Sequence, residues 1–184
     1  MCYPGKLVSA TLVLSFAVGY AASLYAVEFA DPVPYPVGTG PRDIVVADFN
    51  GDGRLDFATT NVGSGNISIL LGNGDGIFQG AVNFDSGLTN PVALAKGDFN
   101  NDGKLDLATF QAGDPGPGTT GALSVLLGKG DGSFQSAKTT KLAVALDMAV
   151  ADFDLDHKAD VAIADLDSSG KIRILILIGI GDGT

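Results

Sequence analysis

The residues best suited to chemistry in this sequence lie in three short, Asp-rich segments. Residues 48–56 read DFNGDGRLD, residues 98–106 read DFNNDGKLD and residues 152–160 read DFDLDHKAD. Each segment carries an oxygen-bearing side chain at its first, third, fifth and ninth positions. Calcium is a hard cation that takes six to eight oxygen ligands in flexible geometry. The spacing therefore predicts a calcium-binding loop in each segment.

The expected ligands are four side chains per loop and the backbone carbonyl of the seventh residue. In the first loop they are Asp48, Asn50, Asp52, the carbonyl of Arg54, and Asp56. In the second they are Asp98, Asn100, Asp102, the carbonyl of Lys104, and Asp106. In the third they are Asp152, Asp154, Asp156, the carbonyl of Lys158, and Asp160. Carboxylates crowded into one short loop would repel one another without a cation, which favours metal binding over simple Asx turns.

Other metals and other calcium motifs fit this pattern less well. Magnesium prefers a smaller octahedral site and retains water, and zinc would call for Cys or clustered His. An EF-hand needs a Glu at position twelve between flanking helices, but that position holds Thr59, Thr109 or Ile163. Nonapeptide β-helix repeats recur every nine residues, whereas these segments recur about every fifty.

The third loop departs from the other two. His157 stands where they have Gly53 and Gly103, which permit a sharp turn through positive φ. Leu155 replaces a Gly or Asn, and Ala159 replaces a Leu. We expect strain at His157 to outweigh the extra carboxylate of this loop and to leave it the weakest site.

A second landmark follows each Asp-rich segment and completes a repeat. Residues 70–79 read LLGNGDGIFQ and residues 126–135 read LLGKGDGSFQ, while a third copy runs from Leu177 to Thr184 and stops partway. The period of about fifty residues is in the range of propeller blades. Asp and Gly in these segments suit a hairpin turn.

Within one period we expect four short β-strands. They are Ile44–Phe49, Leu55–Thr60, Ile67–Leu71 and Phe78–Phe84, separated by turn-rich stretches. An antiparallel meander of these strands places the Asp-rich loops and the Gly-Asp-Gly turns at the same end. We expect these aromatic residues to fill the core under the loops: Phe49, Phe99 and Phe153. We expect Phe78 and Phe134 to pack between blades.

The two landmarks, recurring in order, resemble the FG-GAP repeat of integrin α-subunit propellers and of bacterial VCBS-repeat proteins. The resemblance covers residues 41–184 and implies an all-β fold of tandem four-stranded antiparallel propeller blades, with calcium in the loops between the first and second strands. Two repeats are complete and the third is truncated. A propeller has four to eight blades. We therefore expect further blades, or another copy of the chain, to close the ring.

The N-terminus predicts a targeting segment. Residues 7–24 are apolar with small residues, Lys6 is the only charged side chain before them, and two small-residue cleavage patterns follow at 21–23 and 24–26. We assign residues 1–26 to a signal peptide in preference to a retained membrane anchor, and residues 27–40 to a Pro- and Gly-rich leader. Cys2 is the only cysteine, so a secreted mature chain would have no disulfide and metal would be its staple.

The composition limits the partners. The formal net charge is −10, from an acid inventory of twenty Asp and one Glu, and the pI is about 4.2. Nucleic acid is disfavoured because an acidic surface cannot neutralise phosphates. We expect a protein or glycan ligand, no membrane association once the signal is removed, and a secreted, cell-surface or periplasmic location.

Three functions remain open, and we predict the first. It is calcium-stabilised recognition or adhesion by a protein that is not an enzyme. The second is the propeller of a polysaccharide lyase or hydrolase, for which Arg42, Arg54, Lys96 and Lys104 are unclustered acid–base candidates. The third is a fragment without activity of its own. No Ser-His-Asp or Cys-His arrangement favours an enzyme. The long loop at residues 111–121 is a natural place for ligand recognition.

Overall fold

The computed structural model describes residues 29–113, 121–142, 144–167 and 169–183. The predicted signal peptide therefore lies outside the described residues, as do the first two residues of the leader. Residues 1–33 and 34–184 form separate units, and all the strands belong to the second unit. In the described part no helix occurs, and hence none that could span a membrane.

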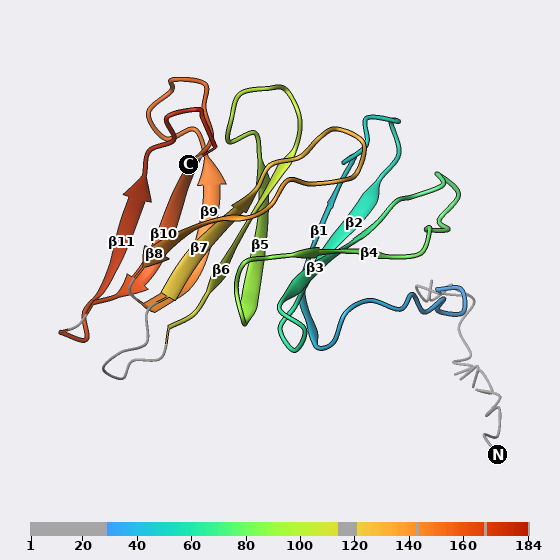
Figure 1. Ribbon diagram of the computed structural model, residues 1–184, viewed down its shortest axis with the longest axis horizontal. Helices are drawn as coiled ribbons and strands as arrows, with labels where there is room; N and C mark the ends of the chain where they lie inside the picture. The colour runs from blue at the N-terminus through green and yellow to red at the C-terminus, as the bar shows by residue number, and fades with distance from the viewer. Residues whose placement is uncertain (1–28, 114–120, 143, 168, 184) are drawn as a thin grey trace, which may run out of the picture. The chain divides into compact units, whose positions relative to one another are not determined.

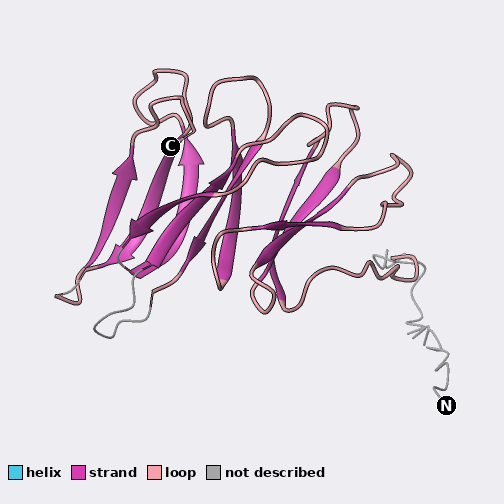
Figure 2. Cartoon of the chain, viewed as in Figure 1, coloured by secondary structure: helices cyan, strands magenta, loops and turns pink. Residues whose placement is uncertain are grey.

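The fold is all-β and consists of three antiparallel sheets (Figures 1 and 2). Sheet 1 contains β1 (Pro41–Ala47), β2 (Asp56–Asn61), β3 (Asn66–Leu70) and β4 (Val82–Asp85). Sheet 2 contains β5 (Pro91–Gly97), β6 (Asp106–Gln111), β7 (Gly121–Leu126) and β8 (Lys138–Leu142). Sheet 3 contains β9 (Val144–Ala151), β10 (Asp160–Leu166) and β11 (Ile172–Leu177). Strands pair in sequence order within each sheet, so each is the predicted meander.

The expected strands are confirmed, with one notable difference in length. The fourth strand of sheet 1 begins at Val82 and not at Phe78. Residues before it pair only through an isolated bridge between Gly72 and Phe78, because the Gly-rich turn occupies more of the chain than the sequence suggests.

The core lies between consecutive sheets, because neighbouring residues of a strand point to opposite faces. In β6, Leu107 packs towards sheet 1 and Ala108 packs towards sheet 3, and both are fully buried. We call the face of each sheet that is turned towards the next sheet in sequence its forward face, and the other its rear face. The prediction that Phe134 packs between blades is confirmed. The centroid of its ring lies 5.9 Å from that of Phe49 and 5.5 Å from that of Phe84.

One core prediction is wrong. Phe49 and Phe99 are buried under their loops, but Phe153 is 46% exposed. The difference follows from the neighbouring sheet. The Gly132 N–H of sheet 2 donates to the Phe49 carbonyl at 3.1 Å, and the Gly183 N–H donates to that of Phe99 at 3.0 Å. In the described part of the chain no such turn covers Phe153.

Candidate functional site

The three Asp-rich segments form the loops β1–β2, β5–β6 and β9–β10. We call them loop 1 (residues 48–56), loop 2 (98–106) and loop 3 (152–160). Each joins two antiparallel neighbours, so all three leave their sheets at the equivalent end, together with the Gly-Asp-Gly turns. The structure thus places the predicted ligands of each loop in one short stretch between two strands, but among the described residues it groups acidic ligand atoms closely only for Asp152, Asp154 and Asp156.

The first Asp of each loop organises the backbone around it. In loop 1, Asp48 Oδ2 accepts the Gly53 N–H at 2.7 Å and Oδ1 accepts the Gly51 N–H at 2.7 Å. These hydrogen bonds lower the pKa of Asp48 and keep it ionised, and the bond from Gly53 has the largest effect. Asp98 and Asp152 accept the equivalent bonds from Gly103 and His157, at 2.8 and 2.9 Å.

The third and fifth positions hold each other in place at the loop surface. Asn50 Oδ1 accepts the Asp52 N–H at 3.1 Å, and Asp52 Oδ1 accepts the Arg54 N–H at 2.9 Å. The same two bonds recur in loop 2 and in loop 3. All three loops therefore share one hydrogen-bonded frame, although loop 3 differs from both other loops in sequence at four positions.

The ninth residue ties each loop to the rest of its sheet. Asp56 is completely buried, and its two oxygens accept the Phe49 N–H and the Gly72 N–H, each at 2.8 Å. Asp106 and Asp160 make the same pair of bonds in sheets 2 and 3. Each carboxylate oxygen has a second lone pair that a cation can use. The sequence predicted these three residues as metal ligands. It did not predict that each would join the start of its loop to the Gly-rich turn of the same sheet.

Loop 3 brings three carboxylates into metal-binding range. One ligand oxygen from each of Asp152, Asp154 and Asp156 lies within 4.8 Å of the others. Ligands of one calcium ion lie 2.3–2.6 Å from it, so two of them are at most about 5 Å apart. The donor set therefore fits calcium. Loops 1 and 2 present an amide oxygen, from Asn50 and Asn100, at the equivalent of Asp154.

The basic residue at position seven folds back over the loop. Lys158 Nζ donates to Asp156 Oδ2 at 2.6 Å, whereas Lys104 Nζ lies 3.4 Å from Asp102 Oδ2 and Arg54 Nη1 lies 3.9 Å from Asp52 Oδ2. The hydrogen bond from Lys158 lowers the pKa of Asp156, and Asp156 in turn raises the pKa of Lys158. In loop 3 the positively charged Lys158 ammonium therefore contacts one of the predicted metal ligands, Asp156.

Two positions in each loop adopt the left-handed backbone conformation. The later one was predicted, and His157 has φ of 68° where Gly53 has 80° and Gly103 has 77°. The earlier one was missed: Gly51 has φ of 74°, Asn101 has 56° and Leu155 has 64°. The sequence did contain a signal for positive φ at this position, because loop 1 has Gly there and loop 2 has Asn, and both residue types tolerate it.

The Gly-Asp-Gly segments act as turns. Asp75 Oδ1 accepts the Ile77 N–H at 3.0 Å, and Asp131 Oδ1 accepts both the Ser133 N–H and its hydroxyl, at 2.9 and 2.6 Å. The Ser133 hydroxyl is the main cause of the lowered pKa of Asp131. These bonds match the turn interpretation of the sequence.

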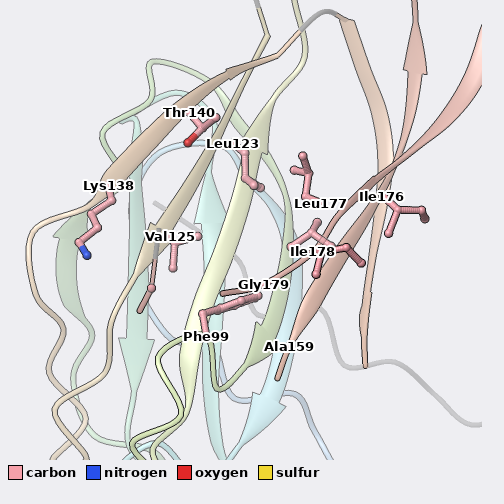
Figure 3. A pocket seen from close by; sticks show the side chains of 12 residues that line it. Phe99, Leu123, Val125, Lys138, Thr140, Ala159, Ile176, Leu177, Ile178 and Gly179 are labelled. Carbon is pink, nitrogen blue, oxygen red and sulfur yellow. The ribbon is translucent and has the colours of Figure 1, made fainter. Parts of the chain in front are cut away.

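An apolar pocket of about 480 Å³ lies between sheets 2 and 3 (Figure 3). Phe99, Leu123, Val161 and Ile178 are among the residues that line it, and Lys138 is the only charged one of them in the described part. The Lys138 ammonium donates to the Asp182 carbonyl at 3.4 Å. The described residues that line the pocket include no acid–base pair for chemistry.

Comparison with known families agrees with this geometry. Residues 48–109 match the sequence model of the FG-GAP-like repeat. The match begins at the first Asp of loop 1, spans one full period and continues through loop 2 into β6. It confirms the resemblance seen in the sequence. No curated protein matches the chain.

Proposed function

We propose that this FG-GAP-like repeat protein binds calcium through its three loops and acts in recognition or adhesion outside the cell. The observation that carries the proposal is the set of carboxylate oxygens of Asp152, Asp154 and Asp156 within 4.8 Å of one another. The same hydrogen-bonded frame holds the ligands of loops 1 and 2. Oxygen-only ligands in an exposed loop favour calcium over zinc or magnesium.

Calcium would supply charge neutralisation and a crosslink within each loop. The first and fifth residues of each loop are partly or fully exposed carboxylates, so a cation can reach them from solvent. The ninth residue is buried and joined to the Gly-rich turn. An ion that touches the first and fifth residues would therefore crosslink a loop that the ninth residue already joins to its sheet. This fastening suits an exported chain in which Cys2 is the only cysteine.

The contacts of the basic residues favour a recognition role over catalysis, because these side chains are engaged in separate local interactions. Lys96 Nζ donates to the Val46 carbonyl at 2.6 Å, and Arg54 and Lys104 fold onto Asp52 and Asp102. None of these three converges with another on one site. The loops at the opposite end of the sheets, which include residues 61–66 and 111–121, are the proposed surface for a protein or glycan ligand. Residues 114–120 lie outside the described part of the chain.

Calorimetric titration with calcium, and separately with magnesium, tests metal binding. We expect two sites of similar affinity from loops 1 and 2 and a weaker third site. Extracellular calcium modules bind at about 10⁻⁴ to 10⁻³ M, so roughly millimolar calcium should stabilise the fold by about 0.4 to 1.4 kcal/mol per site. No heat of calcium binding, or an equal response to magnesium, would contradict the proposal.

A glycan- and protein-binding screen tests the second half of the proposal. The chain should capture a ligand in calcium and lose it in EDTA, without turnover of that ligand. A turnover assay on the same glycans separates recognition from catalysis. Cleavage of a bound polysaccharide would show an enzyme instead.

A further inference from the structure

The sequence contains two Asn-Gly dipeptides, Asn50-Gly51 and Asn73-Gly74, and the structure places them in different surroundings. An asparagine followed by glycine is prone to lose its side-chain amide. The backbone nitrogen of the next residue can attack the carboxamide carbon, and glycine has no Cβ to hinder the attack. The reaction needs a carboxamide that is free to turn and a backbone N–H that no other group holds. The hydrogen bonds around each dipeptide therefore decide which asparagine reacts.

The carboxamide of Asn50 is held within loop 1. Its Oδ1 accepts the Asp52 N–H and its Nδ2 donates to Asp52 Oδ2, each at 3.1 Å. The attacking group is occupied as well, because the Gly51 N–H donates to Asp48 Oδ1 at 2.7 Å. Asn50 therefore has neither a free carboxamide nor a free N–H beside it.

The side chain of Asn73 has no such restraint. Asn73 and Gly74 are both exposed, in the Gly-rich turn after β3. The Asn73 N–H donates to the Ile77 carbonyl at 2.8 Å and holds the turn closed. Among the described residues, no group hydrogen-bonds to the Asn73 carboxamide or to the Gly74 N–H. The two groups that must react with each other are thus without a competing partner in that part of the chain.

The exposure of Asn73 does not depend on what lies against the rear face of sheet 1. Lys129 is the equivalent residue of sheet 2, because each follows the glycine that bonds to the ninth residue of the loop. Sheet 1 covers the rear face of sheet 2, where Leu107 is buried, and yet Lys129 is exposed. A residue at this position therefore stays accessible beside a neighbouring sheet.

We propose that Asn73 is a site of spontaneous deamidation and that the hydrogen-bonded frame of loop 1 protects Asn50 from the same reaction. The Gly74 nitrogen attacks Cγ of Asn73, its proton passes to the departing amide nitrogen, and the Cγ–Nδ2 bond breaks to release ammonia. Water then opens the cyclic imide at either of its carbonyl–nitrogen bonds. The product is an aspartate or an isoaspartate at residue 73, and water is the only co-reactant.

Either product changes the end of sheet 1 that carries loop 1. Arg54 and Asn73 line the same hollow on the rear face of sheet 1. The Arg54 side chain lies against Gly74, because a Cβ at that glycine would be 3.1 Å from Arg54 Cδ. Conversion therefore adds a negative charge beside the basic residue of loop 1. The isoaspartate also adds a carbon to the backbone of a turn that the bond between Asn73 and Ile77 closes.

Peptide mapping by mass spectrometry tests the proposal. The full chain is incubated at mildly alkaline pH in calcium and, in parallel, in EDTA, because the proposal does not rest on metal binding. In both solutions we expect Asn73 to convert about tenfold faster than Asn50 or more, since a hydrogen bond to a charged group must open before Asn50 can react. In urea the two dipeptides should react at similar rates. Equal rates in the folded chain, faster conversion of Asn50, or an unchanged ratio in urea would overturn the proposal.

Loss of the protecting bond gives a second test. Asp48→Ala removes the acceptor of the Gly51 N–H and should make Asn50 convert several-fold faster, while the rate at Asn73 stays the same. Asp48→Asn is the conservative control, because its side-chain oxygen can still accept that N–H. An unchanged rate at Asn50 in Asp48→Ala, or an equal increase in both variants, would show that this bond does not protect Asn50.

The charge of the aged chain identifies the reacting residue independently. Ageing should produce a more acidic species that ion-exchange chromatography separates from the original chain. Asn73→Gln should suppress this species, because attack on the longer side chain requires a larger ring that forms more slowly. Asn50→Gln should leave its yield unchanged. An acidic species that forms at the wild-type yield in Asn73→Gln, or that disappears in Asn50→Gln, would overturn the proposal.

Discussion

Asp106 and Gly128 are joined by a buried hydrogen bond of 2.7 Å, in which the Gly128 N–H donates to Asp106 Oδ1. The other oxygen accepts the Phe99 N–H at 2.8 Å. The carboxylate therefore connects the start of loop 2 to the Gly-rich turn after β7. The bond repeats in sheets 1 and 3, so the two sequence landmarks of each period are physically one structure.

Asp106→Asn should destabilise the fold even in EDTA. An amide can replace only one of the two acceptors, and its NH₂ group would face the N–H of Phe99 or Gly128. A buried donor left without a partner costs about 1–3 kcal/mol. We expect a loss of that size in urea unfolding. Asp102→Asn, at an exposed position of the same loop, should cost much less in EDTA. Equal losses would show that the buried pair of bonds is not what matters.

The loss of stability caused by Asp106→Asn should also depend on pH. Burial raises the pKa of Asp106 above its ordinary value, so its contribution to stability is present below the unfolded-state pKa and is lost as the pH rises through the folded-state pKa. The asparagine variant lacks this gain on acidification. Its deficit relative to wild type in EDTA should therefore grow as the pH falls across that interval. A deficit that shrinks over the interval would contradict the assignment.

Asp52→Ala and Asp102→Ala should each lower the melting temperature in calcium and remove one calorimetric site. Both carboxylates are at the loop surface, where water can replace their hydrogen bonds. In EDTA each change should be neutral or slightly stabilising, because it relieves repulsion between carboxylates. Differential scanning calorimetry in both solutions checks this. If the loss in EDTA equals the loss in calcium, these residues act through hydrogen bonds and not through a metal.

Lys158→Gln should tighten calcium binding at loop 3. The change removes the ammonium that donates to Asp156 at 2.6 Å but keeps the backbone carbonyl of position seven. With loops 1 and 2 silenced by Asp52→Ala and Asp102→Ala, we expect a several-fold higher affinity. Lys104→Gln, measured in a chain where only loop 2 binds, should have a smaller effect because its separation from Asp102 is 3.4 Å. Equal effects would exclude the short Lys158 contact as the cause.

The sequence was sufficient to predict the sheets and the composition of the loops, because those features depend on local patterns. The alternation in Leu55–Thr60 and the turn residues around it specify a strand wherever that segment lies. The exposure of Phe153 was not predictable in the same way. The equivalent phenylalanines are buried by a turn that belongs to the next sheet. The contact between Tyr35 and Phe78 joins residues 43 apart, and a Pro-rich leader gives no local sign of it.

In the backbone of loop 3, the sequence predicted strain at His157 alone. The structure shows that Leu155 is also left-handed, with φ of 64°. Histidine is several-fold more tolerant of this region than a bulky apolar residue, so Leu155 is the more strained of the two. The left-handed conformation costs a residue with a Cβ about 1–2 kcal/mol.

Leu155→Gly should therefore tighten calcium binding at loop 3 more than His157→Gly does. Strain lowers the fraction of molecules whose loop is in the binding conformation, and the apparent affinity falls in proportion. Relief of about 1 kcal/mol corresponds to roughly a fivefold gain. Leu155→Ala is the control, because it removes the exposed side chain but keeps the Cβ that causes the strain. Calorimetry with loops 1 and 2 silenced should show the gain for glycine and not for alanine. If both variants bind alike, the leucine side chain and not the backbone limits the site.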